Sequence, residues 1–164
     1  MLDANRRRAL DAAIELTFFG YRALTGRADA LLAARGLSRM HHRILHFVAR
    51  LEDPSVGALL RTLGVTKQAV NGPLRDLYAQ KLITFDRPPD DARVKRLSLT
   101  PEGKRLEGRL SALQRAQFAA TFAAVGETAE AAWRAAMEHF ARDELARAGY
   151  RLPDRRTHGA DRAA

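Results

Sequence analysis

The chain has 164 residues, enough for one domain with a sizeable core, and 46% of them are hydrophobic, which excludes a disordered protein. No apolar run approaches the ~20 residues of a membrane span, the N-terminus has no signal-peptide pattern, and the lack of cysteine excludes disulfides and thiolate chemistry. A formal net charge of +9 favours a polyanionic partner, nucleic acid ahead of an anionic membrane surface.

Apolar residues recur every three to four positions over residues 5–35 and predict a long first helix that ends at Gly36. The apolar residues lie on more than one face of this helix, which indicates that it packs against a partner as well as its own domain. A second helix is predicted over residues 38–51, with Ser38 as its N-cap.

Two shorter helices follow. They are predicted over residues 56–63 and 66–80, are capped by Ser55 and Thr66, and are separated by Gly64. Two short helices that meet across a tight glycine-containing turn are typical of a helix-turn-helix.

The pattern then changes from helical to extended. Residues 82–86 and 94–99 have β propensity and partly alternate, and the Pro- and Asp-rich residues 87–93 between them indicate a turn. The sequence therefore predicts a β-hairpin with a charged tip. A helix-turn-helix followed directly by a β-hairpin is a winged helix.

The remainder of the chain is helical again. Thr100 and the proline after it are a strong helix start, and helices are predicted over residues 101–124 and 128–148. The polar, Arg-rich residues 150–164 are expected to form a mobile tail. The predicted fold is mostly α with a small β-hairpin wing.

The basic charge is concentrated in the middle of the chain. Residues 38–105 hold thirteen basic and seven acidic residues, whereas residues 106–148 hold five and six. A basic centre beside a nearly neutral segment indicates a binding module held by a scaffold, although a chance distribution of solvated charge gives the same numbers.

Short motifs follow one another at matching spacing over about residues 5 to 148. They are Gly36-Leu37-Ser38, Leu63-Gly64-Val65-Thr66-Lys67-Gln68, Leu77, Lys81-Leu82-Ile83, Asp91-Ala92-Arg93 and Leu97-Ser98-Leu99-Thr100-Pro101-Glu102-Gly103. In this order they resemble the MarR family of bacterial transcriptional regulators.

The resemblance implies one domain over residues 1–149. Helices 5–35 and 101–148 would form the dimerisation region, and residues 38–100 would form a winged-helix lobe that binds double-stranded DNA. It further implies a cytoplasmic, nucleoid-associated homodimer on a palindromic operator, usually a repressor released by a small-molecule effector, with no membrane partner.

A step of 100° per residue divides the helix over residues 66–80 into two faces. The apolar face, predicted to pack on the core, holds Val70, Leu74 and Leu77. The opposite face holds Gln68, Asn71 and Arg75. Their amide and guanidinium groups can pair with base edges in the major groove, and Thr66 and Lys67 at the helix start are placed for phosphate. The alternative is an ordinary solvated face.

The middle of this helix departs from the family pattern. Pro73 has no N–H and crowds the carbonyl of Ala69, so a kink is predicted at Gly72-Pro73. Such a kink would change the orientation of Arg75 relative to Gln68.

The predicted wing carries a candidate minor-groove residue. In the family pattern, Asp91 would brace Arg93, and a narrow A·T-rich minor groove attracts a guanidinium. A surface salt bridge is the alternative. Arg87, Lys95 and Arg96 are expected to touch phosphate or nothing.

His41, His42 and His46 form a cluster in the second predicted helix. His42 and His46 are four residues apart and are expected to point away from the core, a spacing that can bind a divalent cation through two imidazoles. Further ligands would have to come from a dimer partner, for example from His139 or Glu138. The alternatives are a solvated or interfacial polar face, or the lining of an effector crevice.

No pattern supports an enzyme, because the chain has no Gly-rich phosphate loop, no serine elbow and no paired carboxylates in a plausible cleft. No cofactor is predicted. The stripe formed by Trp133, Met137 and Phe140 is expected in the core or in a dimer interface. The rivals to a ligand-responsive regulator are a metal-sensing regulator and a non-specific basic architectural protein.

Overall fold

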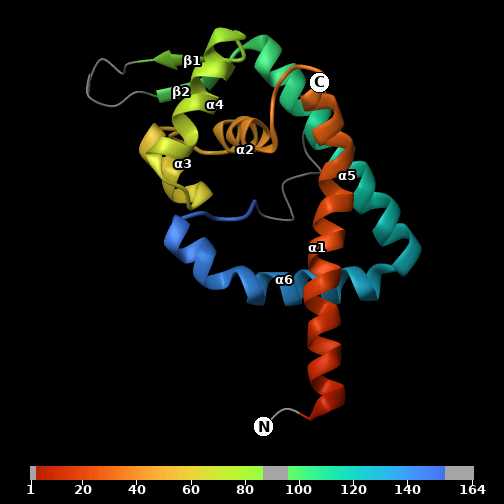
Figure 1. The fold of residues 1–164 in the computed structure, drawn as a ribbon. Helices are drawn as coiled ribbons and strands as arrows, with labels where there is room; N and C mark the ends of the chain where they lie inside the picture. The colour runs from red at the N-terminus through yellow and green to blue at the C-terminus, as the bar shows by residue number, and fades with distance from the viewer. Residues whose placement is uncertain (1–2, 87–95, 154–164) are drawn as a thin grey trace, which may run out of the picture.

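The computed structural model describes residues 3–86 and 96–153 (Figure 1). In chain order its elements are α1 (Ala4–Ala33), α2 (Arg39–Val48), α3 (Val56–Leu63), α4 (Lys67–Ala79), β1 (Ile83–Asp86), β2 (Arg96–Leu99), α5 (Pro101–Val125) and α6 (Glu127–Ala148). The order confirms the predicted fold, mostly α with a small antiparallel hairpin after a helix-turn-helix.

Side-chain caps explain why most predicted helix starts are right to within a residue or two. Ser55 accepts a hydrogen bond from the amide of Ala58 (3.1 Å), and Thr100 accepts one from the amide of Gly103 (3.0 Å). Each satisfies one of the amides that a helix start leaves without an intrahelical partner.

The predicted end of the second helix is wrong, because α2 ends at Val48 and not at residue 51. Arg50 lies beyond the helix, and its Nη1 donates to the carbonyl of His46 (2.8 Å) and pairs with Glu107 Oε1 of α5 (2.6 Å). The Arg50 side chain thus donates to a carbonyl at the helix end, and its carboxylate partner Glu107 is far away in the sequence.

The elements are arranged as one lobe and an extension (Figure 1). Helices α2, α3 and α4 and the hairpin form the lobe. The long α1 packs along α5, and α6 turns back from the end of α5 and reaches α3. None of these helices, in the part of the chain that the structure describes, is long and apolar enough to cross a membrane.

The hydrophobic core lies in the lobe. Only the C-terminal part of α1 enters it, and α6 buries none of its residues in the single chain that the structure describes. The fully buried large side chains are Leu32, Ile44, Leu45, Leu59, Val70, Leu77, Leu82, Ile83, Leu97, Leu106 and Leu110.

The hairpin is joined to the segment before α3. β1 and β2 pair antiparallel, with Phe85 opposite Leu97. On its other side β2 forms a bridge from Arg96 to Ser55, and the amide of Leu97 donates to the carbonyl of Pro54 (2.8 Å). The segment just before α3 is thus attached to the edge of the two-stranded sheet by an isolated bridge.

Tyr150, the first residue of the predicted tail, contacts the helical part of the chain. The amide of Tyr150 donates to the carbonyl of Leu145 (3.0 Å), and the Tyr150 ring lies 5.4 Å from that of Phe47 in α2, centroid to centroid. Tyr150 therefore belongs to the folded domain because its ring has an aromatic partner. Residues 154–164 lie outside the described part of the chain.

Candidate nucleic-acid interface

The turn between α3 and α4 fixes how the second helix of the motif is presented. Gly64 ends α3 in the left-handed conformation (φ 62°), which glycine adopts without steric cost. Thr66 then accepts a hydrogen bond from the amide of Ala69 (3.4 Å) and starts α4. The two helices are therefore connected by only two residues, Val65 and Thr66, beyond the glycine.

The two faces of α4 are as predicted. Val70, Leu74 and Leu77 are buried. The side chains expected to contact DNA are all exposed: Thr66, Lys67, Gln68, Asn71 and Arg75. Their contacts with DNA stay predictions, but α4 presents these polar side chains away from its buried face.

Helix α4 is not broken at the glycine–proline step. It runs from Lys67 to Ala79 with Pro73 inside it, and Gln68 and Arg75 on either side of the step are both exposed. The kink, and the reorientation of Arg75 that would follow from it, stay predictions.

The candidate wing residues Arg87, Asp91, Arg93 and Lys95 lie outside the described residues. Arg96 is described, and its Nε pairs with Asp53 Oδ1 at 2.8 Å. This cation is therefore paired with the segment before α3, beside the backbone bridge to the wing.

The expectation that His42 and His46 share a face pointing away from the core is wrong for His42. His41 and His42 are both 5% exposed. A helix this short, packed against α1, α4 and α5, has little surface left for solvent. Burial, and next the neighbouring His46, lower the pKa of His42, so it is neutral at pH 7.

A polar network on the α2–α5 boundary was not visible in the sequence. Glu107 Oε1 lies 2.6 Å from Arg50 Nη1, 2.5 Å from Ser111 Oγ and 3.5 Å from His46 Nδ1. Desolvation by burial raises the pKa of Glu107, but these hydrogen bonds and the Arg50 charge outweigh it and lower the pKa to about 2. No sequence motif marks Glu107, because two of its partners, Arg50 and His46, are far away in the sequence.

The histidines do not make a metal site within the single chain. The ring centroids of His42 and His46 are 6.2 Å apart and nearly perpendicular, and His41 is bonded elsewhere, to Ser38 and Asp76. Residues 3–86 and 96–153 contain no group of three His, Cys, Asp or Glu residues that could hold a metal ion. A further ligand from a second copy stays a prediction.

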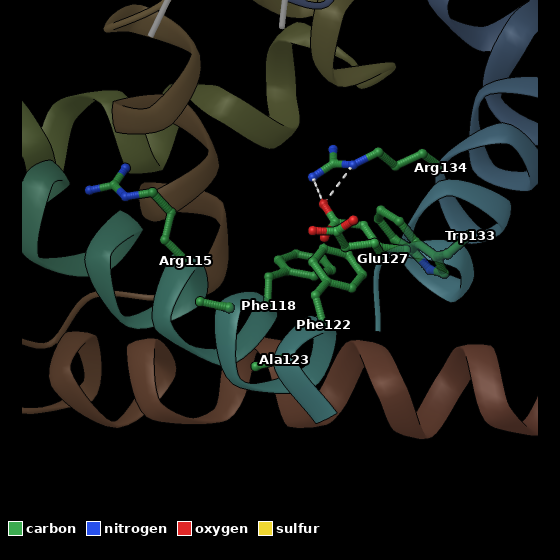
Figure 2. A pocket seen from close by; sticks show the side chains of 9 residues that line it. Arg115, Phe118, Phe122, Ala123, Glu127, Trp133 and Arg134 are labelled. Atoms are coloured by element: carbon green, nitrogen blue, oxygen red, sulfur yellow. Dashed lines mark hydrogen bonds and ion pairs between the residues drawn. The ribbon is translucent and has the colours of Figure 1, made fainter. Parts of the chain in front are cut away.

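The described part of the chain also has a hollow of about 600 Å³ between α5 and α6, away from the α4 face. Figure 2 shows the Phe118 and Phe122 rings of α5 facing Trp133 of α6, with all three centroid pairs within 5.2–5.5 Å. Trp133 and Met137 are 40% and 41% exposed, and Phe140 is 81% exposed. The core placement expected for this stripe is therefore wrong for the single chain, and the interface placement stays a prediction.

Comparisons with known proteins agree with this architecture. Residues 35–94, which span α2 to the hairpin, match the MarR family. The chain is 38% identical over 125 residues to the HTH-type transcriptional regulator PetP of Rhodobacter capsulatus, covering 76% of this chain and 75% of PetP.

Solved structures share the fold. The S. aureus MepR–DNA complex matches with a TM-score of 0.66 at 17% identity, over 80% of this chain and 96% of MepR. CouR from Rhodococcus jostii RHA1, bound to p-coumaroyl-CoA, matches with a TM-score of 0.65 at 21% identity, over 80% of this chain and 92% of CouR. The chain belongs to the MarR family of HTH-type transcriptional regulators, and it is a DNA-binding regulator and not an enzyme.

Proposed function

We propose that the protein is a homodimeric repressor that reads a palindromic operator on nucleoid DNA in the cytoplasm and is released by a small ligand. The observation that carries the proposal is the exposed polar face of α4, opposite the buried Val70, Leu74 and Leu77. A helix that projects amide and guanidinium groups from a helix-turn-helix is suited to reading base edges in the major groove.

The apolar surface of α1 supports the dimer. Its N-terminal half leaves Ile14, Leu16, Phe18 and Phe19 57–72% exposed in the single chain. Large apolar patches of this kind mark interfaces in soluble proteins. The exposed Trp133, Met137 and Phe140 of α6 supply a second apolar surface for the same interface.

Dimerisation supplies the mechanism of repression. Two copies of α4 related by a two-fold axis match half-sites about one helical turn apart. A dimer on a promoter excludes polymerase by its bulk. A ligand that changes the spacing of the two α4 helices weakens DNA binding without touching DNA.

We place the effector at the junction of α1, α2 and α5, beside His42. The Nε2 atom of His42 is buried and has no hydrogen-bond partner in the part of the chain that the structure describes, and such an atom costs free energy unless a ligand or water satisfies it. CouR, a structural relative, binds an aromatic acyl-CoA. These two observations support a small organic effector with a polar atom for His42.

The direct test is selection of DNA from a randomised library by the full chain, followed by footprinting. We expect an inverted repeat, bound by two protomers, with a large affinity ratio over scrambled DNA at physiological salt. A salt titration that gives equal affinities for all sequences would instead identify a non-specific architectural protein.

On the selected operator, Arg93→Ala should weaken binding severely and leave dimerisation and thermal stability intact.

A further inference from the structure

One buried side chain connects the helix proposed to read DNA with the start of α2. His41 is 5% exposed, and its Nε2 lies 3.2 Å from Asp76 Oδ2 on α4. Its other ring nitrogen, Nδ1, lies 2.9 Å from the backbone nitrogen of Ser38, the N-cap of α2. The two ring nitrogens therefore contact two different helices.

The Ser38 contact fixes the tautomer of His41. A backbone amide can only donate, so Nδ1 accepts and carries no proton. The proton of the neutral ring is then on Nε2, which donates to the Asp76 carboxylate. His41 is thus oriented by the N-cap of α2 and presents a directed donor to α4.

Apolar packing sets the rotation of α4 about its axis only coarsely, because the contacts of Val70, Leu74 and Leu77 with the core are not directional. A hydrogen bond to a charged acceptor is directional and strong. Asp76 follows Arg75 in sequence and is 59% exposed, so it puts a negative charge on a helix proposed to approach phosphates. The Asp76 charge opposes DNA binding, and its hydrogen bond to His41 explains why a carboxylate can be useful at this position.

A second polar contact ties the C-terminal end of α4 to the same region. Gln80 Nε2 donates to the carbonyl of Arg35 (3.3 Å), in the segment that joins α1 to α2. Two polar contacts therefore link one side of α4 to the α1–α2 junction. We propose that His41 is a positioning residue that sets the orientation of α4 for DNA reading through Asp76. This inference rests on the proposed role of α4.

The test compares two substitutions of Asp76 in the full chain. Asp76→Asn and Asp76→Ala both remove the charge, but only asparagine keeps an oxygen that accepts from His41 Nε2. His41→Asn is the complementary change, because its amide oxygen replaces Nδ1 as the acceptor for Ser38 but cannot reach Asp76. Each variant is measured against the operator selected by the wild type and against a scrambled duplex.

We expect Asp76→Asn to bind both duplexes more tightly and to keep the wild-type affinity ratio. Asp76→Ala and His41→Asn should each lower the ratio of operator to scrambled-duplex affinity about tenfold. The double variant that combines them should lower it no further, because both substitutions remove the same hydrogen bond. Equal ratios for Asp76→Asn and Asp76→Ala, or additive losses in the double variant, would overturn the proposal.

Hydrogen exchange of residues 67–80 without DNA gives a second readout. We expect about tenfold faster exchange in Asp76→Ala than in Asp76→Asn at unchanged melting temperature. Identical exchange would show that the bond does not hold α4. If the wild type selects no DNA sequence, the proposed function fails, and the exchange comparison still decides whether His41 positions α4.

Discussion

Gly103 marks the closest approach between α5 and the chain just before β1. A Cβ atom at this position would lie 1.9 Å from the carbonyl oxygen of Leu82, which is backbone and cannot give way. Thr100 holds the two segments together, because its Oγ1 donates to the carbonyl of Lys81 (2.7 Å). Gly103→Ala should therefore cost about 3 kcal/mol of unfolding free energy by overpacking.

The same helix offers a matched control for this prediction. A Cβ at Gly108 meets nothing within 4 Å. Gly108→Ala should be neutral or stabilise by up to about 1 kcal/mol through helix propensity. Denaturant midpoints of the two variants measure both effects, and equal midpoints would mean that the Leu82 contact relaxes without cost.

Glu107 makes stability depend on pH at the acid end. Its pKa falls from an ordinary 4.5 to about 2 in the folded protein, so the folded state binds its proton less readily than the unfolded state. The carboxylate therefore stabilises the fold above pH 4.5, and this contribution is lost as the pH falls towards 2. Between pH 7 and pH 3 the loss amounts to about 2 kcal/mol.

Glu107→Gln removes the titrating group and isolates its contribution. Between pH 7 and pH 3 the unfolding free energy of both proteins should fall. The fall should be about 2 kcal/mol smaller in the variant than in the wild type. If the unfolding free energies of the two proteins change in parallel with pH, the contacts of Glu107 with Arg50 and Ser111 do not lower its pKa.

At the scale of the element, we predict that α4 binds phosphate at its start and reads bases further along its length. Arg75→Ala should lower the preference at one base pair of each half-site by roughly 1–3 kcal/mol, because its guanidinium shares the exposed face with Gln68 and Asn71. Lys67→Ala should weaken all sequences alike and reduce the salt slope by about 1, because Lys67 lies at the helix start.

A randomised half-site library distinguishes these two effects. If both substitutions lower affinity equally across the library, Arg75 is a phosphate contact. Base reading would then rest on Gln68 and Asn71, and a change of helix direction at Pro73 would be the physical reason.

The elements show which features a sequence can predict. Helix starts were predictable because Ser55, Thr66 and Thr100 each accept a hydrogen bond from the amide three residues away. The end of α2 and the burial of His42 were not, because they depend on packing against other helices, among them α5, which is distant in the chain. The wing residues of the candidate site, with Arg93 among them, lie outside the described structure and stay predictions.

At the scale of the whole molecule, the two halves of α1 differ in how far the chain covers them. Ile14 is 70% exposed in the N-terminal half of the helix, whereas Ala28 and Leu32 near its other end are fully buried. Periodicity predicted the helix and its two apolar faces, but not which half is covered by the chain itself. That division follows from where α5 runs beside α1.

Ile14→Glu should dissociate the dimer. A carboxylate buried in an apolar interface without a partner costs several kcal/mol, so the dimer dissociation constant should rise at least ~100-fold. Arg27→Glu, at an exposed polar position of the same helix, is the control and should leave the dimer intact. Sedimentation equilibrium of both variants measures the constants, and a wild type that sediments as an 18.2 kDa monomer would contradict the prediction.

The contact between β2 and the segment before α3 bears on which distances in the protein a ligand could change. Because β2 is hydrogen-bonded to Pro54 and bridged to Ser55, and Arg96 pairs with Asp53, we expect the strands and the segment before α3 to move together. Under the proposed function, the distance between α4 and the two strands would then stay the same in each protomer when a ligand binds. We therefore expect a ligand to change the spacing of the two half-sites, and operators with altered half-site spacing should respond differently to it.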